Sequence, residues 1–117
     1  MKIILLARSS SGGSYEVEFQ PVENSIRIFC HCQAGMLQHM CKHKLALIKG
    51  DMKMLFDPQQ ATLLSGIQSW PQFVGLKART DAYEKELGEI EAAKSKLASR
   101  EKELKQRFAR GLTRGFD

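Results

Sequence analysis

Three cysteines and one histidine form the pattern that most constrains what this chain can fold into. Cys30, Cys32, Cys41 and His43 read C-x-C-x8-C-x-H, and the 117-residue sequence has no other cysteine. Two close pairs of thiolate and imidazole ligands joined by a short loop are what a tetrahedral structural zinc ion takes. The pattern therefore predicts one structural Zn2+ held by these four residues.

The fourth ligand is open to alternatives. His39 lies two residues before Cys41, and His31 lies between the first two cysteines. His43 is favoured because a helix that begins just after Cys41 would carry it in its first turn. Three buried free cysteines without a metal are the alternative to the site itself. Iron and copper are alternatives to zinc, although three sulfurs and one nitrogen suit zinc best.

Alternating apolar and polar residues predict strands at 14–20 and 25–32, and the short apolar run 2–7 is expected to complete a small antiparallel sheet of three strands. Side chains two apart on a strand point the same way, so the strand at 25–32 would direct Cys30 and Cys32 to one ion. The segment 33–40 is expected to be a loop in which Gly35 is available for a positive φ.

Helix signals follow the sheet. A helix is expected over residues 42–49, with Gly50 as its stop signal. Asp57 and Pro58 are typical of the first residues of the next helix, which would end before Pro71. Residues 71–79 would then connect to a long helix that begins at Thr80-Asp81, with Asp81 and Glu84 placed for a capping box.

The long helix carries heptad spacing, in steps of 4 and 3, at Tyr83, Leu87, Ile90, Lys94, Leu97, Glu101, Leu104 and Phe108. From 81 to 110 it would extend about 45 Å, too far for three short strands to cover. We therefore expect an α+β chain divided into a zinc finger with N-terminal strands (1–57), a helix and connector (58–75), and a long helix with a basic tail (76–117).

The ligand pattern and the elements expected around it resemble one known family. C-x-C-x8-C-x-H, after a hairpin and before a helix, resembles the SWIM-type zinc finger over roughly residues 14–50. The resemblance implies a ββα arrangement and assigns Cys30, Cys32, Cys41 and His43 as zinc ligands. Members of that family are thought to bind DNA or other proteins. The ATPase motifs of larger SWIM-containing proteins are absent from this sequence.

Charge favours nucleic acid as a partner, but only weakly. The chain has 18 Lys and Arg against 13 Asp and Glu, a net charge of +5, and an isoelectric point near 9.3. The candidate contacts are Lys42, Lys44 and Lys49, with Lys53 nearby, and in the tail Lys105, Arg107, Arg110 and Arg114. The alternative interpretation is a solvated face and a helix end whose basic residues complement the dipole.

A second functional hypothesis is assembly through the long helix. Its apolar stripe would be buried against a second copy or a partner helix, giving a protein-protein interaction module. Lys94 and Glu101 occupy core-type positions, and antiparallel pairing could place Lys94 near Glu101 of the other helix. The alternative is that the helix folds back on the finger and completes one small core.

Several functional classes are disfavoured. Four protein ligands leave a zinc ion without an open position for substrate, and no deaminase, P-loop, nucleophile-elbow or zinc-protease motif occurs. We therefore expect a non-enzymatic chain with no small-molecule substrate. The apolar run at the N-terminus stops at Ala7, too short for a signal peptide core, and no stretch is long enough for a membrane span. A cytoplasmic or nuclear location is expected.

Overall fold

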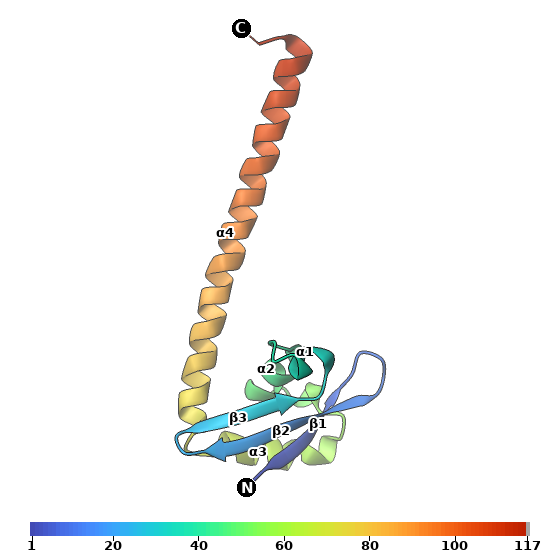
Figure 1. Ribbon diagram of the computed structural model, residues 1–117, viewed down its shortest axis with the longest axis vertical. Coiled ribbons are helices and arrows are strands. Elements are labelled where there is room, and N and C mark those ends of the chain that lie inside the picture. Colours follow the sequence, from blue (N-terminus) through green and yellow to red (C-terminus); the bar gives the residue numbers. More distant parts are fainter. Residues whose placement is uncertain (117) are drawn as a thin grey trace. The chain divides into compact units, whose positions relative to one another are not determined.

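The structure is a computed structural model that describes residues 1–116 and has the predicted α+β class (Figure 1). Strands β1 (Ile3–Arg8), β2 (Ser14–Val22) and β3 (Ser25–Cys30) form an antiparallel sheet in the order β1-β2-β3. The helices are α1 (Gln33–Met36), α2 (Lys42–Ile48), α3 (Ala61–Gln68) and α4 (Phe73–Arg114), with two 3-10 turns, η1 (Met52–Met54) and η2 (Pro58–Gln60). The chain divides into two compact units, Met1–Asp81 and a second that begins at Ala82.

The predicted alternation of the strands is confirmed. On β2, Val17 and Phe19 are fully buried and Tyr15 is half-buried, while Glu16 and Gln20 are exposed. Val17 is paired with Cys30 on β3, and Phe19 with Ile28, so the register carries the apolar face of β2 onto β3. One face of the sheet therefore supplies a continuous apolar floor that ends at the first cysteine.

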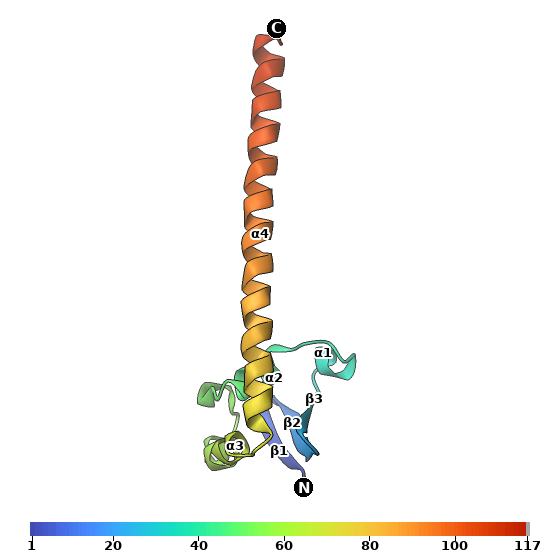
Figure 2. The same ribbon diagram turned by 90° about the vertical axis from the view of Figure 1, so that its left-hand side faces the viewer.

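Helices cover that floor from one side, as Figure 2 shows for α2 and α3. The core residues that they and the following segments contribute are Leu47, Ile48, Leu55, Leu64, Ile67 and Phe73. Trp70 and Leu76 pack against this core while remaining half-buried. A core of this size leaves little margin of stability for a domain of about 80 residues, because such domains bury a modest share of their surface.

The outer edge of β1 is occupied by the chain segment before α3. Ala7 forms an isolated bridge with Leu55, and the N–H of Phe56 donates to the carbonyl of Leu6 at 2.9 Å. The side chain of Gln60 accepts from the N–H of Leu6 at 2.8 Å and donates to the carbonyl of Ile4. These bonds satisfy main-chain groups that an uncovered edge strand would expose.

Two predictions near the metal ligands were wrong. β3 ends at Cys30, and Cys32 is the N-cap residue of α1, which lies inside the segment expected to be a loop. Gly35 does not have a positive φ; that conformation belongs to Gln38, at 60°. Gly35 is required for a different reason, since an added Cβ would collide with the main chain of Cys30.

The start of the long helix was also predicted wrongly. α4 begins at Phe73, inside the segment expected to be a connector, and Thr80 lies within it, with its hydroxyl donating to the carbonyl of Leu76 at 2.9 Å. Phe73 and Thr80 are both buried in the first unit, so packing extends the helix backward beyond the local capping signal. The Asp57 N-cap and Pro58 were predicted correctly, although they begin the 3-10 turn η2 that leads into α3.

In the second unit, the described residues form the remainder of α4. Its heptad side chains are exposed, from 38% for Leu87 to 59% for Leu97 and Leu104. None of the helices in residues 1–116 combines the length and the apolar character that crossing a membrane would require.

Candidate metal centre

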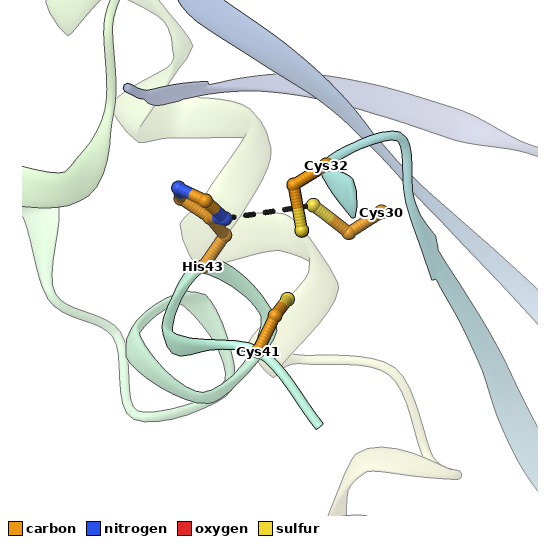
Figure 3. Close-up of side chains that lie close together, drawn as sticks. All are labelled: Cys30, Cys32, Cys41 and His43. Atoms are coloured by element: carbon orange, nitrogen blue, oxygen red, sulfur yellow. Dashed lines mark hydrogen bonds between the residues drawn. The ribbon is translucent and has the colours of Figure 1, made fainter. Parts of the chain in front are cut away.

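The structure brings the four predicted ligands together (Figure 3). Sulfur atoms of Cys30, Cys32 and Cys41 and a ring nitrogen of His43 all lie within 4.8 Å of one another, and all four side chains are buried. Among the described residues, this is the group of metal-binding side chains that comes together in this way. The side chains come from the end of β3, the start of α1 and the start of α2.

The first pair is positioned by a strand end followed by a helix start. Cys30 ends β3 opposite Val17, which fixes its side chain in the apolar floor. Cys32 caps α1, and its sulfur accepts a hydrogen bond from the N–H of Gly35 at 3.3 Å. A helix N-terminus presents unpaired N–H groups and the positive end of its dipole, and both favour a thiolate.

The second pair repeats this arrangement on α2. Cys41 is the N-cap residue, and its sulfur accepts from the N–H of Lys44 at 3.4 Å. His43 lies in the first turn of the same helix. The prediction that Cys41 precedes the helix and that His43 lies in its first turn is therefore confirmed.

The His43 ring is oriented toward the sulfurs. Its Nδ1 lies 3.7 Å from Sγ of Cys30, and the ring of Tyr15 lies 5.2 Å away, centroid to centroid. Its Nε2 is buried and has no hydrogen-bond partner among the described residues. Burial and, after it, the positive charge of Lys42 lower the pKa of His43 against an opposing contribution from the Arg8 main chain, which favours the neutral imidazole that metals bind.

The thiols differ in how readily they ionise. Burial raises the pKa of the Cys30 thiol to about 12, so this group holds its proton at neutral pH unless a cation replaces it. Burial also opposes ionisation of Cys32, but the N–H of Gly35 and the sulfurs of Cys30 and Cys41 outweigh it, and the pKa of Cys32 is lowered. A site with such buried thiols needs a positive charge to become a set of thiolates.

The distances fit one metal ion. In a tetrahedron with metal–sulfur and metal–nitrogen bonds of about 2.3 and 2.0 Å, neighbouring ligand atoms lie about 3.5 to 3.8 Å apart. The 3.7 Å between Cys30 and His43 matches this spacing, and the 4.8 Å limit for the whole set requires only small side-chain adjustments. Cys30, Cys32, Cys41 and His43 can therefore hold one ion with all four positions filled by protein.

The other histidines lie outside the cluster. Nε2 of His31 lies 2.7 Å from Oε2 of Glu18, and the ammonium of Lys2 contacts the other carboxylate oxygen, Oε1, at 2.8 Å. His39 is exposed and follows α1. The structure therefore favours His43 over both alternatives as the fourth ligand.

The predicted nucleic-acid contacts are divided between the two units. Lys42 and Lys44 are on α2 beside the ligands, and Lys49 follows that helix. The tail residues Lys105, Arg107, Arg110 and Arg114 lie on the exposed end of α4, where Lys105 is paired with Glu101 at 2.8 Å. Arg107, Arg110 and Arg114 are spaced by three and four residues on α4 and so lie on one face of that helix.

Sequence reasoning missed the amides of Gly35 and Lys44 as hydrogen-bond donors to sulfur. Both follow their cysteine by three residues, the same offset that links an ordinary N-cap side chain to the N3 amide. For Lys44 the available signal was the helix expected directly after Cys41, which makes Cys41 an N-cap candidate. Comparisons of the chain with family models, with curated proteins and with solved structures found no match.

Proposed function

We propose that this chain is a non-enzymatic binding module of the SWIM zinc-finger type, in which zinc is structural and nucleic acid, most simply DNA, is the partner. The observation that carries the zinc proposal is the buried Cys30, Cys32, Cys41 and His43 cluster. Three sulfurs and one nitrogen in a closed tetrahedral set are characteristic of structural zinc. Because protein atoms fill all four positions, no site for substrate remains on the ion.

Structural zinc would supply much of the stability of the first unit. Binding of zinc by such ligand sets contributes on the order of 10 kcal/mol to folding at neutral pH. The small core of residues 1–81 is of the size that benefits from such a contribution. The ion would join β3 and α1 to α2, and through Leu47 and Ile48 of α2 it would hold the helical layer against the sheet.

The support for nucleic acid is the charge distribution. Lys42 is exposed and Lys44 half-exposed on α2, next to Cys41 and His43, and the C-terminal end of α4 adds exposed arginines. Basic groups on a helix supported by a metal site can contact phosphates. The net charge of +5 adds a general attraction to a polyanion.

Binding to a short labelled DNA duplex, measured by fluorescence anisotropy at two salt concentrations, tests this proposal. We expect binding that weakens steeply with salt, and a further loss in the variants Lys42→Gln/Lys44→Gln and Arg110→Gln/Arg114→Gln. The variant Lys77→Gln/Lys85→Gln removes the same charge from other exposed positions and is the matched control. Equal losses in all three variants, or no binding at low salt, would reject a specific nucleic-acid surface.

The second candidate function is assembly through α4, and the exposed heptad stripe favours it. Tyr83, Ile90 and Leu97 are 41%, 45% and 59% exposed on one face of a helix that is otherwise rich in charge. Apolar side chains repeated at this spacing are normally buried against another helix. The two candidates are compatible, since two linked copies would present two fingers to one nucleic acid.

A further inference from the structure

The exposed stripe of the second unit contains two charges at positions that a partner helix would cover. Lys94 and Glu101 continue the spacing set by Ile90, Leu97 and Leu104, and every described side chain of this stripe is exposed. Each charge would be costly to bury beside a like charge or an apolar group alone. The partner helix must therefore accommodate one positive and one negative side chain that lie seven residues apart on the stripe.

A second copy of this chain in the opposite direction meets that requirement. In a parallel pair with aligned registers, Lys94 would face Lys94 of the second copy, and Glu101 would face Glu101. In an antiparallel pair, each Lys94 instead lies one layer from Glu101 of the second copy, about 6 Å along the axis and within reach of the two long side chains. Two symmetric ion pairs then replace two repulsive contacts.

We propose that α4 pairs with α4 of a second copy as an antiparallel coiled coil centred between Ser95 and Lys96. This inference rests on the second candidate function above and specifies its partner and orientation. The register covers the whole stripe, with the core layers Leu87–Leu104, Lys94–Leu97, Glu101–Ile90 and Phe108–Tyr83, each formed twice by symmetry. Aromatic pairs close both ends, where they exclude water from the apolar layers.

The residues flanking the stripe support the same orientation independently. They are acidic in its first half, at Glu84, Glu86 and Glu91, and basic in its second half, at Arg100, Lys105 and Arg107. Flanking charges in coiled coils determine the choice and orientation of the partner. The antiparallel register places Glu84 opposite Lys105 and Glu86 opposite Arg107 of the second copy, so opposite charges meet along both sides.

The parallel arrangement brings like charges together within the stripe. Flanking residues then interact with positions five residues later in the second copy, which brings Glu86 to Glu91 and Arg100 to Lys105. The intrahelical pair between Glu101 and Lys105, at 2.8 Å, does not oppose antiparallel pairing, because both side chains are largely in solvent. Charge therefore selects one orientation at both the core and the flanking positions.

The oligomeric state of the full zinc-loaded chain is the first test, measured by light scattering after size-exclusion chromatography. We expect a dimer, and we expect Ile90→Glu to convert it to a monomer because the new carboxylate would face Glu101 of the second copy within the core. Ser99→Glu adds the same charge on the opposite, exposed side and should leave the dimer intact. A monomeric wild-type chain, or a dimer that Ile90→Glu does not weaken, overturns the proposal.

Orientation is tested by mixing 14N- and 15N-labelled chains and treating them with a carbodiimide, which joins carboxylates directly to amines. We expect mixed-isotope cross-links between Lys105 of one copy and Glu84 of the other. In a parallel pair these residues lie about 31 Å apart along the axis and cannot be joined. Cross-linked dimers that lack this linkage overturn the antiparallel arrangement.

A charge reversal gives an independent measurement of orientation. Glu86→Arg would face Arg107 of the second copy in the antiparallel pair, and we expect the dimer dissociation constant to rise about tenfold. Adding Arg107→Glu should restore it. In a parallel pair Glu86→Arg would face Glu91 and strengthen association, which is the opposite result.

Separate experimental outcomes would reject nucleic-acid binding and antiparallel dimerisation. If Ile90→Glu is monomeric but still binds DNA through zinc-finger lysines, nucleic-acid binding stands without assembly. If the wild-type chain forms the antiparallel dimer and does not bind DNA at low salt, the partner proposed above is wrong while this inference holds.

Discussion

The N–H of Gly35 donates to Sγ of Cys32 at 3.3 Å, and at the same position Gly35 approaches the main chain of Cys30 too closely for any side chain. One residue thus supports the first two candidate ligands in different ways. It provides a hydrogen bond that favours the thiolate of Cys32, and its missing Cβ allows α1 to approach the end of β3.

Replacing Gly35 by Ala should therefore destabilise the first unit. We expect a loss of about 1 to 3 kcal/mol in the free energy of unfolding of the zinc-loaded chain, because the added methyl group must displace main-chain atoms. Urea unfolding measures it. Gly66→Ala is the matched control, since open space surrounds that position on α3, and it should stabilise by about 0.5 to 1 kcal/mol. An unaffected Gly35→Ala chain would mean that α1 can move away without cost.

His43→Ala should weaken zinc binding far more than His39→Ala. His43 Nδ1 lies among the sulfurs, whereas His39 is exposed and outside the cluster. We expect at least about a 100-fold loss of zinc affinity for His43→Ala, since losing a ligand exceeds the cost of losing one of its supporting contacts. Competition with a chromophoric chelator measures the affinity. Similar losses for both variants would show that the two histidines exchange.

Removal of zinc should affect the two units differently. With a chelator, or with Cys41→Ser, we expect the first unit to lose its fixed packing, because its core is small and the ion would join β3 to α2. The fluorescence of Trp70, which packs against that core, reports this loss. Circular dichroism should still show the helical signal of α4 beyond Ala82. An unchanged tryptophan signal in the chelator would contradict a structural role for zinc.

The side chain of Gln60 should contribute measurably to stability. Gln60→Ala removes the bonds to the N–H of Leu6 and the carbonyl of Ile4, and we expect a loss of about 1 kcal/mol. Gln59→Ala, at the exposed neighbouring position, should change the free energy of unfolding by much less. Thermal unfolding of both variants under the same zinc concentration provides the comparison, and equal values would remove any role for the edge contact.

The sequence predicted those parts of the fold whose signals are periodic or local. Alternation at Tyr15, Val17 and Phe19 identified a strand, and the need to direct Cys41 and His43 to one ion placed Cys41 before a helix. It could not predict the start of α4. Thr80-Asp81 resembles a helix start, and only the burial of Phe73 in the core shows that the helix extends further back.

The close contact at Gly35 was equally inaccessible to sequence reasoning. A glycine in a turn-rich segment suggests a positive φ. Gly35 is needed instead because α1 packs closely against the end of β3 and leaves no room for a Cβ. The candidate ligand set was accessible, because the spacing of the three cysteines suggested the site and the helix expected after Cys41 favoured His43 as its fourth member. Packing between distant segments was not, because it depends on three-dimensional contacts that a single sequence does not reveal.

The contact between Gln60 and β1 has a consequence for the order in which the chain can acquire its structure. The four candidate ligands lie within 14 consecutive positions, from Cys30 to His43, whereas Gln60 reaches back 54 residues to Leu6. During synthesis the ligands and the hairpin of β2 and β3 leave the ribosome well before Gln60 does. A metal-stabilised intermediate can therefore form while the N-terminal strand still has an open edge, and the segment 55–60 closes that edge when it emerges later.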